Sequence, residues 1–167
     1  MKKYFLIATI AIALISLMSS MTYEQQSIVP FLQTYFANKP FEQALRSIEI
    51  LYWNRIISVD TSGYYYFLEF LIRKATHFFG YGFGGVIFYG IYRHLRWRFP
   101  ALIAIISIFV IASLDEYRQS LTPGRTGIFQ DVLLDTCGAV VCISFFALLL
   151  FLVRGTTKVQ AQKMGGR

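Results

Sequence analysis

"FQDVLLDTCGAVVCISFFALLLFLV", residues 129–153, is an apolar run that carries charge only in its first two turns. About 20 apolar residues are enough to cross the hydrocarbon core of a bilayer, so this run is long enough. Asp131 and Asp135 lie at its beginning, and a carboxylate near lipid needs a partner, water or a function. The stretch therefore predicts a transmembrane helix with a polar site at one end.

The composition of the whole chain indicates the same class of protein. Of its 167 residues, 56% are hydrophobic and only 15% are charged, whereas about a quarter of the residues of a soluble domain are charged. Three further apolar runs are long enough to cross a bilayer: 4–21, 67–92 and 101–119. Because open sheet edges are not tolerated in lipid, we expect an all-α membrane protein, a bundle of four transmembrane helices.

The first run has two interpretations. We expect residues 1–21 to be a retained N-terminal transmembrane anchor, because the run is longer than the apolar core of a signal peptide. Small residues occur at the end of the run, in "SLMSSM", so a cleaved signal peptide is the alternative. Neither interpretation changes what is expected of the rest of the chain.

Basic residues predict the orientation in the cell membrane. They lie on the segments that flank the runs at one side, and these segments contain no Asp or Glu. The basic residues are Lys2, Lys3, Arg93, Arg96, Arg98, Arg154, Lys158, Lys163 and Arg167. By the positive-inside rule we expect a multi-pass protein with both termini in the cytoplasm and residues 154–167 as a basic cytoplasmic tail. The net charge of +7 then reflects topology, and we expect no nucleic-acid partner.

Residues 22–66 separate the first two runs and are extracytoplasmic in this orientation. Apolar residues recur at helical spacing over 40–57, which predicts an amphipathic helix. A shorter helix is expected at 31–36. These helices lie either on the outer leaflet of the membrane or on the bundle as a small cap, and both arrangements stay open.

In this orientation, polar residues of three runs meet at the extracytoplasmic end. Arg73, His77 and Tyr81 follow one another at i, i+4 and i+8, and Asp115 with Gln119, like Asp131 with Asp135, share a helix face. The candidate site comprises Arg73, Lys74, His77, Tyr81, Asp115, Glu116, Gln119, Arg125, Asp131 and Asp135. We expect these side chains to form one nearly neutral, internally paired cluster.

Small residues predict where the helices approach one another. Gly80 and Gly84 have the small-xxx-small spacing that admits a neighbouring helix, and Gly138 is expected to do the same for the last run. Cys137 and Cys142 lie on different faces of that run, so we expect packing residues and no disulfide framework.

Three motifs, in order along the chain, resemble the VanZ-like family of integral membrane proteins. They are R-K-x-x-H-F-x-x-Y at 73–81, D-E-x-x-Q-x-x-x-P-G-R at 115–125 and D-V-x-x-D-x-x-G at 131–138. The resemblance covers residues 67–153 and implies a VanZ-like three-helix core there. The family is named after a teicoplanin-resistance protein, so a contribution to glycopeptide (teicoplanin-type) antibiotic resistance is one consequence that the resemblance implies.

The residue types of the cluster suit an anionic, lipid-linked component of the cell envelope, or an anionic lipid headgroup. We expect Arg73, Lys74, Tyr81, Gln119 and Arg125 to bind it through charge-assisted and neutral hydrogen bonds. We expect His77, Glu116, Asp115, Asp131 and Asp135 to be the catalytic set that handles protons. One histidine among basic residues is a poor ligand set, so we expect neither a metal nor a cofactor.

A second interpretation makes the protein a non-enzymatic membrane scaffold. In it the charged cluster is a salt-bridge network that locks three helices, and residues 22–66 bind a partner. No serine lies in a nucleophile motif, so the sequence is compatible with an enzyme and with a binding protein, and both stay open.

Overall fold

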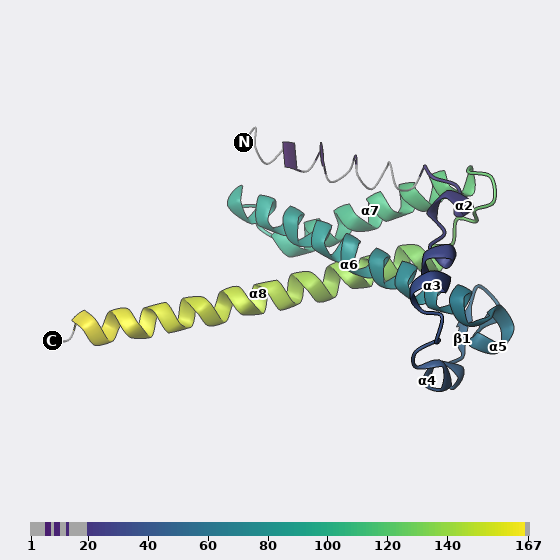
Figure 1. Ribbon diagram of the computed structural model, residues 1–167. Helices are drawn as coiled ribbons and strands as arrows, with labels where there is room; N and C mark the ends of the chain where they lie inside the picture. Colours follow the sequence, from purple (N-terminus) through teal and green to yellow (C-terminus); the bar gives the residue numbers. More distant parts are fainter. Residues whose placement is uncertain (1–5, 8, 11–12, 14–19, 166–167) are drawn as a thin grey trace.

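The computed structural model describes residues 6–7, 9–10, 13 and 20–165 (Figure 1). The predicted anchor at 4–21, with its signal-peptide alternative, lies mostly outside the described residues. The described chain is mostly helical, and three long helices dominate it: α6 (Tyr64–His94), α7 (Pro100–Ser120) and α8 (Phe129–Gly165). Helix α8 continues through most of the predicted tail at 154–167.

The three long helices pack against one another around an apolar core. Helix α6 begins after Gly63, whose φ of 83° requires a residue without a Cβ. Helix α7 begins at Pro100, whose fixed φ suits the first helical position. The buried apolar residues between them are Tyr81, Tyr89, Ala104, Ile108, Ala112, Val132, Ala139 and Ile143.

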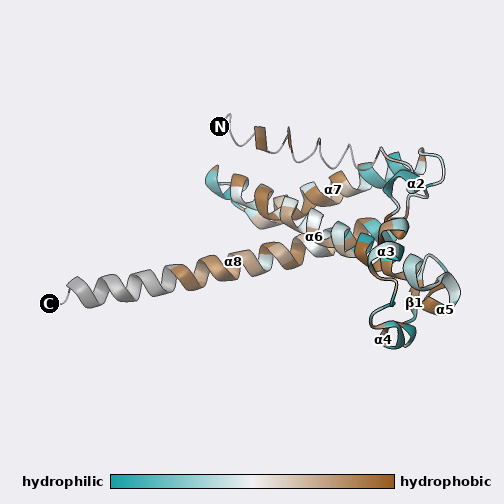
Figure 2. Ribbon diagram, viewed as in Figure 1, coloured by the Kyte–Doolittle hydropathy of each residue, from teal (hydrophilic) through white to brown (hydrophobic). Residues whose placement is uncertain are grey.

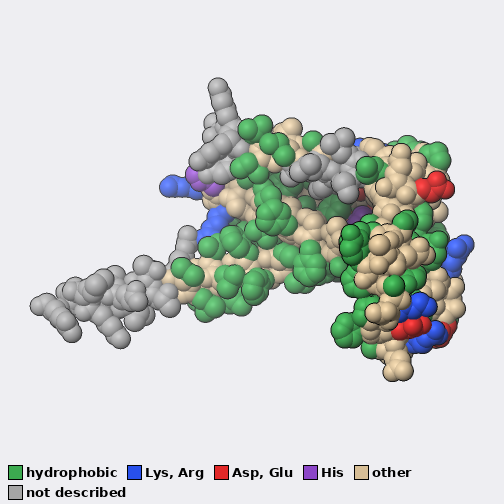
Figure 3. All heavy atoms as spheres, in the orientation of Figure 1, with side chains coloured by type: hydrophobic (Ala, Val, Ile, Leu, Met, Phe, Trp, Pro, Cys, Tyr) green, Lys and Arg blue, Asp and Glu red, His purple; other side chains and the backbone are tan. Residues whose placement is uncertain are grey.

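The outer surfaces of α7 and α8 have the character of membrane-spanning helices. Within the part of the chain that the structure describes, Pro100–Ser120 and Phe129–Val153 are long and apolar enough to cross a membrane. Figure 2 shows both as largely hydrophobic. In Figure 3, apolar side chains cover the visible face of the bundle and charged side chains gather toward its two ends. Two of the predicted spans are thus confirmed as membrane-length apolar helices, and the four-span bundle stays a prediction.

Glycines allow α6 and α8 to approach closely. Of the pair predicted from spacing, Gly84 lies at a helix contact, because its added Cβ would be 3.5 Å from Ile108 Cδ1 of α7, and Gly80 does not. A Cβ added to Gly138 would lie 2.1 Å from the Phe78 carbonyl oxygen, so the prediction for Gly138 is confirmed. On α6, a Cβ added to Gly82 would lie 2.5 Å from Cys142 Sγ. Gly80 would have no atom within 4 Å of its Cβ, so the prediction that it lies at a helix contact is wrong.

The predicted amphipathic helix at 40–57 is also wrong. Helix α4 (Glu42–Arg46) is short, and β1 (Ile50–Tyr52) pairs antiparallel with β2 (Arg55–Ile57). Residues 50–57 are rich in β-branched and aromatic side chains, which favour strands. Trp53 and Asn54 between the strands have φ of 51° and 56°, the positive values of a type I′ hairpin turn. The fold is therefore not all-α.

Residues 22–62 form a cap on the first turns of α6. The other helices of the cap are α2 (Tyr23–Gln26), α3 (Val29–Tyr35) and α5 (Val59–Ser62), and α3 confirms the short helix expected at 31–36. Val59, Tyr64 and Phe67 form a second apolar core to which the cap contributes Leu45 and Ile50. Of the two expected arrangements, the structure has the cap (Figure 1).

Candidate functional site

Arg73, the first residue of the predicted site, belongs to the junction between cap and bundle. Its guanidinium forms a 3.0 Å salt bridge with Glu69 and donates to Gln26 Oε1 at 3.0 Å. It also lies 4.8 Å from the centroid of the Tyr23 ring. Side chains of a helix point back toward its N-terminus, so a long side chain at 73 reaches residue 69 more easily than residue 77.

Glu69 is a buried acid that the sequence analysis missed. It is only 2% exposed, and its carboxylate accepts from the Ile28 N–H at 3.1 Å and from the Ser27 and Tyr23 hydroxyls at 3.3 Å. The i, i+4 spacing of Glu69 and Arg73 is the feature of the sequence from which it could have been identified. These contacts tie α2 and the start of α3 to α6.

Lys74 and Asp131 form an ion pair between α6 and α8. Lys74 Nζ lies 2.5 Å from Asp131 Oδ1, with the two side chains 17% and 10% exposed. The Tyr52 hydroxyl, at the end of β1, donates to the same carboxylate, and Lys74 Nζ lies 4.4 Å from the Tyr52 ring centroid. Burial and the Asp131 carboxylate raise the pKa of Tyr52, which keeps its hydroxyl a donor. Tyr52 was not among the predicted site residues, because the helical interpretation of residues 40–57 placed none of them over the site.

His77 and Asp135 form the second contact between α6 and α8. His77 Nδ1 lies 3.4 Å from the Asp135 carboxylate, which is only 1% exposed. The imidazole stacks on Tyr81, with 5.9 Å between the ring centroids. The buried Tyr81 hydroxyl has no hydrogen-bond partner among the described residues.

Helix α7 contributes a hydrogen-bonded chain that ends on the loop at 121–128. Gln119 donates from Nε2 to Asp115 Oδ2 at 2.8 Å, and Arg125 donates to Gln119 Oε1 at 2.5 Å. Burial lowers the pKa of Arg125, although the nearby carboxylates oppose the effect. Glu116 Oε2 accepts from the Ile128 N–H at 2.8 Å and so holds the start of α8 against α7.

The structure therefore brings together nine of the ten predicted residues and assigns Arg73 to a neighbouring network. The set is rich in carboxylates, and its cations already have partners within the protein. Among the described residues, no group of three or more His, Cys, Asp or Glu side chains is arranged to hold a metal ion. The arrangement offers the titratable imidazole of His77, which contacts the buried Asp135, and the ammonium group of Lys74. The counterion of Lys74, Asp131, also accepts a hydrogen bond from Tyr52 of the cap.

A family model places the chain in a known family. The model of the VanZ/LLP1 family matches residues 4–152, which extends beyond the three motifs at 73–138 in both directions. No curated protein matched the chain, and no solved structure did. The match covers most of the 167 residues. The chain belongs to the VanZ/LLP1 family.

Proposed function

We propose that this VanZ-like membrane protein binds the polar head of an anionic, lipid-linked component of the cell envelope at the extracytoplasmic end of its bundle. The observation that carries the proposal is the Lys74–Asp131 pair beside the His77–Asp135 pair, where apolar helices end under a cap. Charged groups at such a place are costly, and they are a mark of function in membrane proteins.

Lys74 is the proposed anion contact. A phosphate or carboxylate that approaches Lys74 competes with Asp131 for the ammonium group, because each forms a charge-assisted hydrogen bond with it. The Tyr52 hydroxyl donates to Asp131, and the Tyr52 ring lies beside the Lys74 ammonium group. Tyr52 can therefore donate to the new anion together with Lys74. Arg125 is the second proposed contact, since the partners that hold it among the described residues, the Gln119 amide and the Met21 carbonyl, are neutral.

His77 is the proposed proton-handling group. An imidazole changes its charge between about pH 5 and 8, and Asp135 fixes the orientation of the ring. If the protein catalyses a step on its ligand, we propose that this pair moves the proton. Because the family is named after a teicoplanin-resistance protein, teicoplanin susceptibility is the cellular phenotype to measure.

The second candidate function is a scaffold in which the pairs only hold the helices. The observation that favours it is that Arg73, Lys74 and Arg125 each have a partner within the protein. A binding measurement separates the two candidates, because a scaffold does not respond to an anionic lipid.

Trp53 provides a fluorescence readout of binding, because it follows Tyr52 and is one of two tryptophans. In a Trp97→Phe background we expect a polyprenyl phosphate in detergent micelles to change Trp53 emission saturably. Lys74→Gln should abolish the change and raise teicoplanin susceptibility in cells, since it removes the ammonium.

The matched control is Lys39→Gln, which removes an exposed lysine of the cap. It should leave both readouts unchanged. A flat titration of the unsubstituted protein, with Lys74→Gln lowering the melting temperature, would instead support the scaffold.

A further inference from the structure

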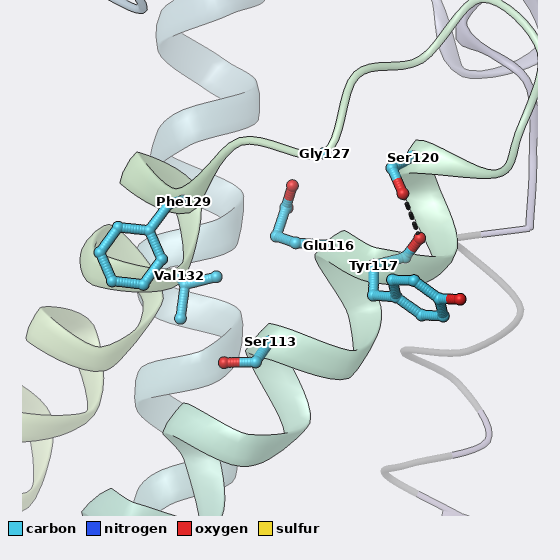
Figure 4. Close-up of a pocket in the computed structure, with 7 residues that line it drawn as sticks. All are labelled: Ser113, Glu116, Tyr117, Ser120, Gly127, Phe129 and Val132. Atoms are coloured by element: carbon cyan, nitrogen blue, oxygen red, sulfur yellow. Dashed lines mark hydrogen bonds between the residues drawn. The ribbon is translucent and has the colours of Figure 1, made fainter.

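A groove of about 220 Å³ lies between α7 and α8, beneath the loop that joins them (Figure 4). Ser113, Glu116 and Ser120 line it from α7, and Val132 lines it from α8. Figure 4 shows the Glu116 side chain extending from α7 toward the loop at Gly127. The groove thus adjoins the polar cluster, with which it shares Glu116.

Three polar side chains that line the groove, those of Ser113, Ser120 and Glu116, offer hydrogen-bond acceptors. The Ser113 hydroxyl donates to the Phe109 carbonyl at 2.7 Å, and the Ser120 hydroxyl donates to the Tyr117 carbonyl at 2.6 Å, so both protons are used. Glu116 is 5% exposed, and its Oε1 is buried with no hydrogen-bond partner among the described residues. A buried carboxylate oxygen without a donor is costly, so the groove is suited to a ligand that supplies one.

The rim of the groove is apolar and lies on the outer surface of the two membrane-length helices. Tyr117 is 67% exposed and Phe129 is 58% exposed, and the apolar neighbours Leu114 and Leu133 are exposed beside them. Ser120 is the last residue of α7 and Phe129 is the first of α8, so the groove lies where both helices end. In a bilayer this is the depth of lipid headgroups, with acyl chains alongside the rim.

We propose that the groove binds a membrane lipid whose headgroup donates an N–H or O–H to Glu116 Oε1. The inference rests on the proposed function, which supplies the premise that the ligand is a lipid. It adds a contact in which the ligand donates a hydrogen bond to the protein, whereas at Lys74 the protein donates to the ligand. Ammonium and hydroxyl headgroups share this chemistry. A trimethylammonium headgroup carries no donor, and it therefore serves as the negative probe.

The full chain is reconstituted with lipids that carry a photoactivatable group on one acyl chain. Phosphatidylethanolamine and phosphatidylcholine probes share their phosphate and chains, and a phosphatidylglycerol probe tests hydroxyl donors. We expect an ammonium or hydroxyl probe to crosslink peptides that contain Tyr117 or Phe129 roughly tenfold more than the choline probe, the ratio for one hydrogen bond to a charged group. Equal yields from all three probes would overturn the inference.

Two variants assign the preference to the groove. Glu116→Gln keeps the shape of the side chain but removes its charge, so the ratio should fall close to one. Ser120→Trp should fill the groove and lower the yield of every probe, while Leu121→Trp, at an exposed neighbour that does not line the groove, should not. An unchanged ratio in Glu116→Gln, or an unchanged yield in Ser120→Trp, contradicts the inference.

The Trp53 titration with polyprenyl phosphate, performed on the Trp97→Phe protein, distinguishes this inference from the proposed function. A saturable Trp53 response together with a donor preference supports both. A saturable Trp53 response in a protein without any donor preference refutes the groove inference alone. A donor preference in a protein without any Trp53 response supports the groove and refutes the anion site at Lys74.

Discussion

At the scale of single residues, spacing along a helix identified most of the cluster but not every partner. His77, Asp131 and Asp135 were found because i, i+4 pairs share a helix face and the ends of α6 and α8 adjoin. The Arg73 side chain turns back to Glu69, and Tyr52 arrives from a hairpin. The Arg73–Glu69 pair has an i, i+4 spacing from which it could have been found. The contact of Tyr52 could not be predicted, because it depends on how residues 22–62 fold.

The Lys74–Asp131 pair gives a prediction for stability. Lys74→Met and Asp131→Asn should each lower the free energy of unfolding in detergent, on the order of 3–5 kcal/mol, because each leaves a buried charge without its partner. The double variant should lose clearly less than the sum of the two single losses. A thermodynamic cycle measured by denaturant unfolding gives this coupling.

The exposed pair of Arg46 and Glu42 is the control for that cycle. Its side chains are 51% and 27% exposed, so solvent screens the charges and the coupling of Arg46→Met with Glu42→Gln should be small. Additive losses at Lys74 and Asp131 would show that the two side chains do not interact in solution.

At the scale of elements, the periodicity of apolar residues predicted helices well where the run was long. The apolar runs at 101–119 and 129–153 became α7 and the first part of α8 because their length and apolar composition admit only a helix in lipid. In the cap, Ile48, Tyr52 and Ile56 are four residues apart. That spacing lies on one face of a helix and equally on one face of a strand, so the pattern could not distinguish them.

The contact between α6 and α8 gives a prediction at this scale. Gly138→Ala would place a Cβ 2.1 Å from the Phe78 carbonyl oxygen, so the helices must move apart. We expect a melting temperature in detergent that is lower by several degrees, and a weaker Trp53 response to polyprenyl phosphate because the His77–Asp135 contact spans the same interface.

Gly80→Ala is the control, since its added Cβ meets nothing within 4 Å. Alanine is the better helix former by about 1 kcal/mol, so this variant should be neutral or more stable. If Gly80→Ala were the damaging change and Gly138→Ala the harmless one, the packing predicted from the small-xxx-small spacing would be right after all.

At the scale of the whole molecule, the polar cluster and the basic segments lie at opposite ends of the helices. Lys74 and His77 are in the first half of α6, whereas Arg93 and His94 are in its last turn. This separation of the charged residues is visible in the sequence, so the positive-inside rule could be applied without knowledge of any contact. The cap could not be predicted as a fold, because its short helices and hairpin depend on packing against α6.

The sorting of charge predicts the topology of the chain in the cell. Single cysteines introduced at exposed positions of the cap, such as Glu49, and of the loop at 121–128, such as Thr126, should react in whole cells with a membrane-impermeant maleimide. A cysteine at Arg96, between α6 and α7, should react only after permeabilisation, because Arg93 and Arg98 remain beside it and favour the cytoplasmic side. The background is Cys137→Ala with Cys142→Ala, which removes both native thiols.

Labelling of Arg96→Cys in intact cells, with the cap protected, would reverse the orientation. The anion site at Lys74 would then face cytoplasmic lipids, and the envelope ligand proposed for it would be untenable.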